Sequence, residues 1–177
     1  VYDFSCGSAA LATILTYYHR INTPEAAVVN ILRQRYPSKD DWHKKNLEGF
    51  SFEDLMFAAW NLGFDSQAAN VDLKDLESFD GPVIVRVRKP KIDHFTVLRK
   101  AKGGFYYLSD PTLGQVVQSE AEFKKEYTGV ALAIWNRDVK LPSTSPLQRI
   151  RDGLSVQRIM SGVVFHEVPW EYPTIKP

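Results

Sequence analysis

The only cysteine of this chain, Cys6, is the residue best suited to act as a nucleophile. It lies in the segment DFSCGS, residues 3–8, directly before a run of good helix formers, and Ser5 is placed to cap that helix. In the first turn of a helix, unpaired amides and the helix dipole stabilise a thiolate, and the amide of Cys6 would face a developing oxyanion. Gly7 would let a substrate backbone approach closely. The alternative is an inert cysteine that only packs the helix start.

A thiol nucleophile needs a base, and the chain has four histidines. His94 is favoured because it begins an apolar segment, residues 95–98, whose expected strand would face the N-terminal helix. His19 lies at the far end of that helix, about 20 Å from the thiol, and is interpreted as a favourable charge at the helix C-terminus. His43 lies among lysines, and no catalytic role is predicted for His166. Taken alone, a histidine at the start of a strand is more often structural.

The base in turn needs an acceptor that orients its ring. Asp93 is adjacent to His94, but neighbours in a strand point to opposite faces of the sheet. Asp110 is better placed, because residues 105–109 are expected to pair antiparallel with the His94 strand across a glycine turn. That hairpin would return Asp110 to a place beside His94. The position is equally consistent with an aspartate that only opens the following proline turn.

These side chains must be positioned by an α+β fold, because helical patterns come first and strand patterns follow. The expected helices cover residues 6–19, 24–35 with Thr23 as the N-cap and Pro24 at the first helical position, part of 38–47, and 51–62 with a capping box at Ser51 and Asp54. The expected strands cover residues 82–88, 93–99, 105–109, 115–118 and 129–135, with a short helix at 121–126. The prediction is a set of N-terminal helices packed on an antiparallel sheet.

The composition changes after residue 135, which suggests two parts. Residues 1–138 are predicted to form the folded domain. Residues 139–177 are predicted to be a linker and C-terminal appendage, with a linker at 141–146, a weakly amphipathic helix at 147–160 and a strand at 163–168. We predict that this appendage contributes no catalytic group.

The overall composition excludes several classes of function. With 44% hydrophobic and 24% charged residues, the 177-residue chain is typical of one soluble globular domain. A net charge of +1 does not favour binding to nucleic acid or to a membrane surface. No apolar run approaches the roughly 20 residues that span a bilayer. No histidine or acid shows metal-ligand spacing, so no metal or other cofactor is implied. Because the chain starts at Val1 rather than Met, we expect that an N-terminal piece has been removed or omitted.

Three segments, residues 3–12, 93–98 and 108–114, together resemble the motifs of the bacteriocin-processing (double-glycine leader) peptidases. Residues 122–123 and 128–132 are similar to the closing segment of that family, so the resemblance extends from about residue 2 to 133 in the family order. It implies a papain-like cysteine peptidase fold. It also implies that Cys6 is the nucleophile, His94 the base and Asp110 the orienting acid. The implied reaction is cleavage of an extended peptide after a Gly-Gly-type site.

The sequence departs from this family in two ways. The family has a glutamine six residues before the cysteine, where it completes the oxyanion hole; here that position falls one residue before Val1. Loss of one oxyanion donor costs roughly 10²–10³ in rate. Many members are also N-terminal domains of ABC exporters, whereas this chain has neither membrane spans nor a P-loop. It resembles instead the stand-alone members, including the peptidases encoded with functional-amyloid (Fap) secretion systems.

That closer resemblance implies a peptide or protein substrate of a secretion pathway and a periplasmic location, with the cytoplasm as the alternative. Two other functions remain open. The same Cys–His pair could transfer an acyl group to an acceptor other than water, since the acceptor is chosen by pocket shape. The chain could also be a leader-binding module that does not cleave, although such modules in the exporter family lack the cysteine that is present here. The sequence does not indicate an oligomeric state.

Overall fold

The computed structural model describes residues 5–79, 81–90 and 92–138. The predicted appendage, with its expected linker, helix and strand, lies outside the described residues, and so does His166. None of the helices in the described ranges is long and apolar enough to cross a membrane.

Helices dominate the first part of the chain, as predicted. They are α1 (Cys6–Thr13), a π-helix (Ile14–Tyr18), α2 (Glu25–Arg35), α3 (Lys39–Glu48) and α4 (Phe52–Asn61), followed later by α5 (Leu73–Glu77) and α6 (Glu120–Glu126). The single helix expected at residues 6–19 is therefore α-helical to Thr13 and then widens into a π-helical turn. The capping box that opens α4 is confirmed, with Ser51 and Asp54 bonded reciprocally. Thr23 was wrongly predicted as the N-cap of α2, since Pro24 holds that position and the Thr23 hydroxyl donates to the carbonyl of Ile21.

The strands form one antiparallel sheet of six strands in the order β1-β6-β2-β3-β4-β5. Their bounds are β1 (Phe64–Asn70), β2 (Val83–Lys89), β3 (Ile92–Lys102), β4 (Phe105–Asp110), β5 (Gly114–Ser119) and β6 (Tyr127–Asn136). All five predicted strands are present and β3 is longer than expected. Strand β1 was not predicted. Its sequence, FDSQAAN, has low strand propensity, and it pairs with β6 along its whole length.

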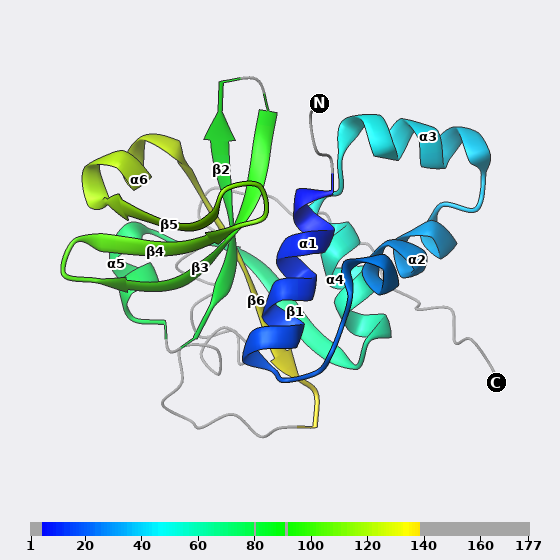
Figure 1. The fold of residues 1–177 in the computed structure, drawn as a ribbon, viewed down its shortest axis with the longest axis horizontal. Helices are drawn as coiled ribbons and strands as arrows, with labels where there is room; N and C mark the ends of the chain where they lie inside the picture. Colours follow the sequence, from blue (N-terminus) through cyan, green and yellow to red (C-terminus); the bar gives the residue numbers. More distant parts are fainter. Residues whose placement is uncertain (1–4, 80, 91, 139–177) are drawn as a thin grey trace.

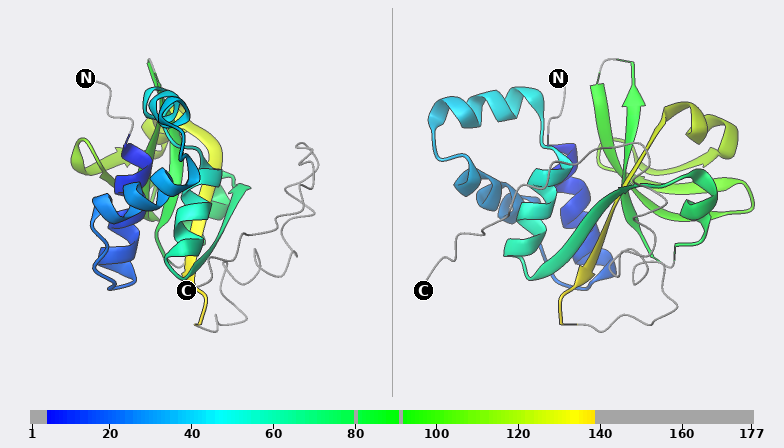
Figure 2. Two further views of the ribbon diagram at one scale, coloured as in Figure 1. Left: turned by 90° about the vertical axis from the view of Figure 1, so that its right-hand side faces the viewer. Right: turned by 180° about the vertical axis from the view of Figure 1, so that it is seen from behind.

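The sheet separates two hydrophobic clusters. On one face α1 and α4 pack against the sheet, with α1 beside β3 and α4 beside β1, while α2 packs on α1 and α4 and α3 lies further out (Figure 1). This cluster includes Cys6, Leu11, Leu55, Phe95, Val97 and Ile134. The cluster on the other face includes Val85, Leu98, Tyr106, Phe123 and Trp135. Seen from behind, α5 lies in front of the sheet and α1 lies beyond it (Figure 2). The α+β prediction is confirmed.

The β3–β4 hairpin is the part of the fold that matters most for the site. Its turn consists of Gly103 and Gly104, which have φ values of 60° and 76°. Two successive residues with positive φ are typical of a tight hairpin turn whose twist matches that of the strands, and glycine adopts this conformation without a steric cost. The turn sends β4 back along β3, so that the end of β4 at Asp110 returns toward the beginning of β3.

Candidate active site

Cys6 is the first residue of α1 and is 5% exposed. Ser5 occupies the cap position, but its side chain accepts no capping hydrogen bond, so the predicted capping role of this hydroxyl was wrong. The Ser8 hydroxyl lies 2.8 Å from the Ser5 carbonyl oxygen and 2.9 Å from Glu25 Oε1. The start of α1 is therefore fixed through the first turn of α2, while the amide of Cys6 has no partner within its own helix.

Gly7 has a different role from the one predicted. A Cβ atom at this position would lie 3.2 Å from Leu55 Cδ2 and 3.2 Å from Phe95 Cδ2. Both distances are tighter than ordinary van der Waals contact. Gly7 therefore faces the protein interior, where it lets the first turn of α1 pack closely against α4 and β3, rather than facing a substrate backbone.

His94 and Asp110 lie together, as the hairpin argument predicts. His94 Nε2 is 2.9 Å from Asp110 Oδ2, and each residue is only 8% exposed. The other carboxylate oxygen, Oδ1, accepts the amides of Thr112 at 2.8 Å and Leu113 at 3.1 Å. Asp93 forms ion pairs with arginines of β2 instead, which confirms that it does not share the side of His94. Asp110 thus has fixed donors on both oxygens.

The thiol of Cys6 meets the same strand. The backbone amide of Phe95, the residue after His94, donates to Cys6 Sγ at 3.5 Å. This amide is available because the pairing of β3 with β4 begins only at Val97. Phe95 is held in turn by Phe52 of α4, with 4.8 Å between the ring centroids. Since His94 Nε2 is committed to Asp110, Nδ1 is the imidazole nitrogen left for the thiol.

The charges of this cluster reinforce one another. Burial lowers the pKa of His94, but hydrogen bonds with Asp110 and Cys6 and the negative charges of both outweigh it and raise the pKa to about 9. Burial raises the pKa of Asp110, but the hydrogen bond from His94 and the amide of Thr112 outweigh it and hold the pKa below its usual value. The imidazolium and the carboxylate are therefore the favoured forms near neutral pH.

The other histidines do not join the cluster. His19 was wrongly predicted to be a charge at a helix end. It is half-buried, its Nε2 lies 3.3 Å from the carbonyl oxygen of Ile134, and its ring packs on Phe64. Burial lowers the pKa of His19, which favours the neutral ring. His43 is exposed on α3.

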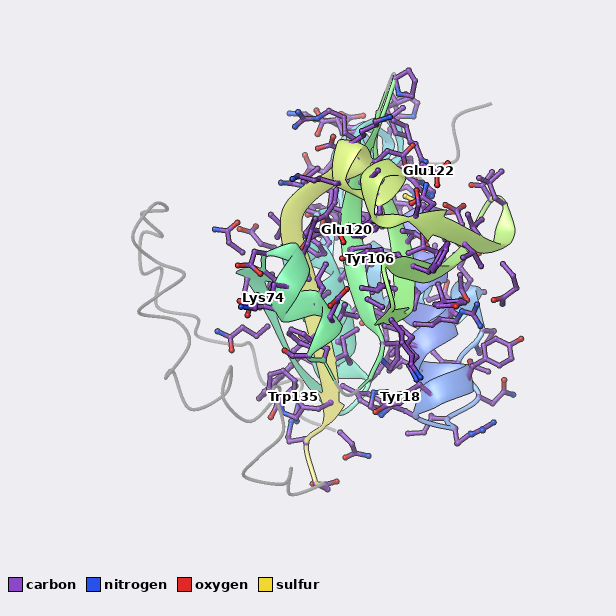
Figure 3. The ribbon with its side chains drawn as sticks, turned by 90° about the vertical axis from the view of Figure 1, so that its left-hand side faces the viewer. Tyr18, Lys74, Tyr106, Glu120, Glu122 and Trp135 are labelled. Carbon is purple, nitrogen blue, oxygen red and sulfur yellow. The ribbon has the colours of Figure 1, made fainter. Side chains whose placement is uncertain are left out.

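Two hollows in the described part of the chain lie on opposite faces of the sheet. One of about 680 Å³ borders Asp110 and runs along α1 and the π-helix to Tyr18. The other, about 780 Å³, lies between α5 and α6 and is lined by residues that include Lys74, Tyr106 and Glu120. These three side chains gather well away from Tyr18 (Figure 3). The hollow beside Asp110 lies on the side of the sheet that α1 covers, and Cys6 is the first residue of that helix.

Comparison with known proteins decides the family. The model of the peptidase C39 family matches residues 3–139. The chain belongs to the peptidase C39 family. The family resemblance inferred from the three motifs is thereby confirmed, and the match contains Cys6, His94 and Asp110.

Individual relatives agree with this assignment. The chain is 32% identical over 132 residues to the "Probable functional amyloid protease FapD" of Pseudomonas aeruginosa, a match that covers 75% of this chain and 57% of that protein. It is 30% identical over 130 residues to the lactococcin-G-processing and transport ATP-binding protein LagD of Lactococcus lactis, covering 72% of this chain and 17% of that protein. The chain therefore spans little more than half of FapD and a small part of LagD.

Solved structures confirm the papain-like fold of a C39 peptidase domain. The peptidase domain of Streptococcus ComA superposes with a TM-score of 0.65 at 24% identity, covering 77% of this chain and 95% of that domain. A double glycine motif protease from an AMS/PCAT transporter, in complex with its leader peptide, superposes with a TM-score of 0.61 at 26% identity, covering 76% and 86%. The glutamine expected before Val1 lies outside the sequence and stays a prediction.

Sequence reasoning missed several parts of the site. The amide of Phe95 is a backbone group, so no residue type in the sequence indicates its contact with the thiol. The contact of Ser8 with Glu25 joins two different helices, and no motif links these residues. The sequence pattern of residues 6–19 also does not indicate that the helix becomes π-helical after Thr13.

Proposed function

We propose that the chain is a thiol peptidase in which Cys6 is the nucleophile, His94 the acid and base, and Asp110 the residue that orients His94. The observation that carries the proposal is the continuous contact from Asp110 to His94 and on to Cys6 at the start of α1. Such a nucleophile, base and orienting acid is the arrangement that covalent acyl transfer requires.

The geometry supports a sequence of balanced steps. Asp110 holds Nε2 of His94, so that the Nδ1–H of the imidazolium faces the thiolate of Cys6. Sγ attacks the peptide carbonyl carbon, and the charge that develops on the carbonyl oxygen faces the amide of Cys6. His94 gives its proton to the leaving amine as the C–N bond breaks. Water, deprotonated by His94, then attacks the thioester, and the acid product and the free thiol are released.

For the substrate we propose an extended peptide, cleaved after a Gly-Gly-type site during processing or secretion of an exported protein. The names of the relatives support this substrate class, since they describe a probable functional amyloid protease, a lactococcin-G-processing protein and a double glycine motif protease. We further propose, from the likeness to FapD, that the reaction takes place in the periplasm. The cytoplasm is the alternative.

The test is to incubate the folded protein with candidate secreted proteins and with Gly-Gly peptides, and to map the products by mass spectrometry. Cys6→Ala should lower the cleavage rate by more than about 10⁴-fold, as removal of a covalent nucleophile does in other peptidases. Its unfolding midpoint should stay close to that of the wild type. Cleavage that persists in Cys6→Ala would contradict the proposal. A product joined to an added amine would indicate acyl transfer, and binding without any product would indicate a module that does not cleave.

A further inference from the structure

The turn between β3 and β4 contains the only two adjacent glycines of the sequence, Gly103 and Gly104. Lys102 and Phe105 pair across this turn, Gly103 is exposed and Phe105 is 50% exposed. A Cβ atom added to either glycine would meet nothing within 4 Å, so the turn is open on that side. A Gly-Gly pair of the type proposed for the substrate therefore lies at the surface of the protein itself.

Two features of the native turn oppose its cleavage. Gly103 and Gly104 have φ values of 60° and 76°, whereas an extended peptide has φ of about −120° to −140°. The carbonyl oxygen of Gly104, which belongs to the bond that would be cut, accepts the amide of Glu120 at 2.8 Å. An oxygen held in this contact is not free to receive the donors of an oxyanion hole. The folded turn is therefore a poor substrate, and an opened turn is a good one.

The donor of this hydrogen bond is firmly placed. Glu120 is the first residue of α6, so its amide has no acceptor within the helix. The preceding residue, Ser119, forms a capping box with Glu122 and pairs with Phe105 of β4. The start of α6 is thus attached to the hairpin whose turn it holds. Loss of one such hydrogen bond changes the ratio of closed to open turn by about two- to tenfold.

We propose that the Gly103-Gly104 turn is a latent self-cleavage site, and that the hydrogen bond from Glu120 to Gly104 protects it. This inference rests on the proposed peptidase function, and its substrate is a second copy of this chain. The cut is made between copies because Lys102, beside the turn, is eight residues from His94 along β3, which corresponds to about 27 Å. In Figure 1 the turn lies at the left of the sheet, away from α1.

The cut follows the proposed peptidase steps. Sγ of Cys6 in one copy attacks the carbonyl carbon of Gly104 in the other, and Phe105 leaves as an amine that takes its proton from His94. Water then hydrolyses the thioester, so that one fragment ends in the Gly104 carboxylate. In the copy that is cut, Asp110 is then joined to β3 by strand pairing instead of by the hairpin. Self-cleavage therefore loosens the triad, at a rate that rises with the concentration of the protein.

The experiment mixes unlabelled wild-type protein with ¹⁵N-labelled Cys6→Ala copies and maps the labelled fragments by mass spectrometry. Glu120→Pro in the labelled copy removes the protecting amide. Proline suits the first position of a helix, and Ser119, with φ of −68° and ψ of 160°, already has the extended conformation that precedes a proline. Glu120→Ala is the matched control, because it removes the same carboxylate and keeps the amide. The proline copy should be cut after Gly104 about three- to tenfold faster than the alanine copy.

Two further labelled copies separate opening of the turn from other causes. Gly103→Asn, added to Glu120→Pro, keeps a favoured Asn-Gly hairpin turn but removes the Gly-Gly pair, and should prevent the cut. Asp54→Asn lowers the stability at a place away from the turn. It should be cut more slowly than Glu120→Pro, since cleavage follows the opening of the turn rather than global unfolding.

The inference would be overturned if the proline copy were cut no faster than the alanine copy, if the cut fell elsewhere, or if it occurred without wild-type protein. A free peptide with the sequence of residues 100–108 and an unrelated Gly-Gly peptide separate this inference from the peptidase proposal. If wild-type protein cuts the unrelated peptide but not the peptide 100–108, the self-cleavage site is wrong and the peptidase proposal stands. If it cuts neither peptide, the peptidase proposal itself fails.

Discussion

Asp54 and Asp110 are two buried carboxylates with the same kinds of partner, backbone amides and a basic side chain, but with different roles. Asp54 is fully buried where α2, α3 and α4 meet. Its Oδ1 accepts the Tyr36 hydroxyl at 2.5 Å, and its Oδ2 accepts the Ser51 amide at 2.8 Å and pairs with Lys45 Nζ at 2.9 Å. Burial raises the pKa of Asp54, but the hydrogen bonds from Ser51, Tyr36 and Lys45 outweigh it and hold the pKa below its usual value.

Asp110 is also held by backbone amides and a cationic partner, and its pKa is likewise lowered. The two regions differ in where the contacts lead. The partners of Asp54 all belong to the helical scaffold, so this carboxylate only joins three helices. The main partner of Asp110 is an imidazole, whose second nitrogen is free to meet the thiol of Cys6. A buried carboxylate thus stabilises structure when its partners have no further reactive contact, and organises chemistry when one of them does.

The scaffold carboxylate still supports the site at a distance. Asp54 fixes the start of α4, and α4 supplies Phe52, which packs on Phe95, and Leu55, which packs on Gly7. These contacts place the strand amide and the helix start on either side of the thiol of Cys6. The comparison therefore predicts that loss of Asp110 affects turnover most, and that loss of Asp54 affects stability most.

The largest effect in this comparison is expected from Asp110→Ala. Without the carboxylate, His94 loses both its orientation and the partner that raises its pKa. We expect kcat/KM to fall by about 10²–10⁴-fold, the range seen when the orienting acid of a comparable triad is removed. Steady-state cleavage of a Gly-Gly peptide, normalised to the folded fraction from circular dichroism, measures it. A loss of activity that follows only a loss of folded protein would mean that Asp110 is structural.

The second effect is expected from Asp54→Asn. It leaves Lys45 and Arg35 without their ion-pair partner, and because each of these side chains keeps 21% exposure the cost should be about 2–4 kcal/mol, below the value for a fully buried pair. The unfolding midpoint should fall by roughly 2–4 °C for each kcal/mol. Glu53→Gln, an exposed change in the same first turn of α4, is the control and should cost less than about 1 kcal/mol. If Asp54→Asn lowered kcat/KM of the folded protein as much as Asp110→Ala, the distinction would be wrong.

Local patterns explain what could be predicted from the sequence. The capping box of Ser51 and Asp54 and the glycine turn between β3 and β4 depend on neighbouring residues, and the structure confirms both. The same hairpin brings Asp110 to His94 by register alone. The placement of Cys6 against this pair came from the family resemblance instead, because no local rule relates Cys6 to the strand of His94, where the residue that contacts the thiol, Phe95, is 89 positions away.

Contacts between distant elements could not be predicted. The capping box indicates that Asp54 caps α4, but not that Tyr36, which follows α2, and Lys45 of α3 also bond to it. The role of Gly7 depends on side chains from α4 and β3, and the pKa of His19 depends on a strand 115 residues away. Strand β1 exists because β6 pairs with it rather than because of its own propensity. In each case tertiary packing overrides the local preference of the residue.

The third effect concerns alkaline pH, where the two regions should again differ. The pKa values of Asp54 and Asp110 are both lowered, so their contributions to stability are present above the usual carboxyl range and are lost only as the pH falls through their folded values. His94 behaves oppositely. Its pKa rises from 6.5 to about 9 on folding, so the unfolded chain binds fewer protons between these values. Its contribution is complete below pH 6.5 and is lost as the pH rises to about 9.

The loss should have a slope of about 1.4 kcal/mol per pH unit and total about 3 kcal/mol. Above pH 9 the imidazolium that protonates the leaving amine disappears, so kcat/KM should fall about tenfold for each further unit. Urea unfolding and peptide cleavage from pH 6 to 10 measure the two curves. His94→Gln should abolish the alkaline loss of stability, whereas Glu53→Gln should keep it. A wild-type stability that is flat from pH 6.5 to 9 would show that His94 does not hold its extra proton, and the contact of Asp110 with His94 would then be as purely structural as that of Asp54 with Lys45.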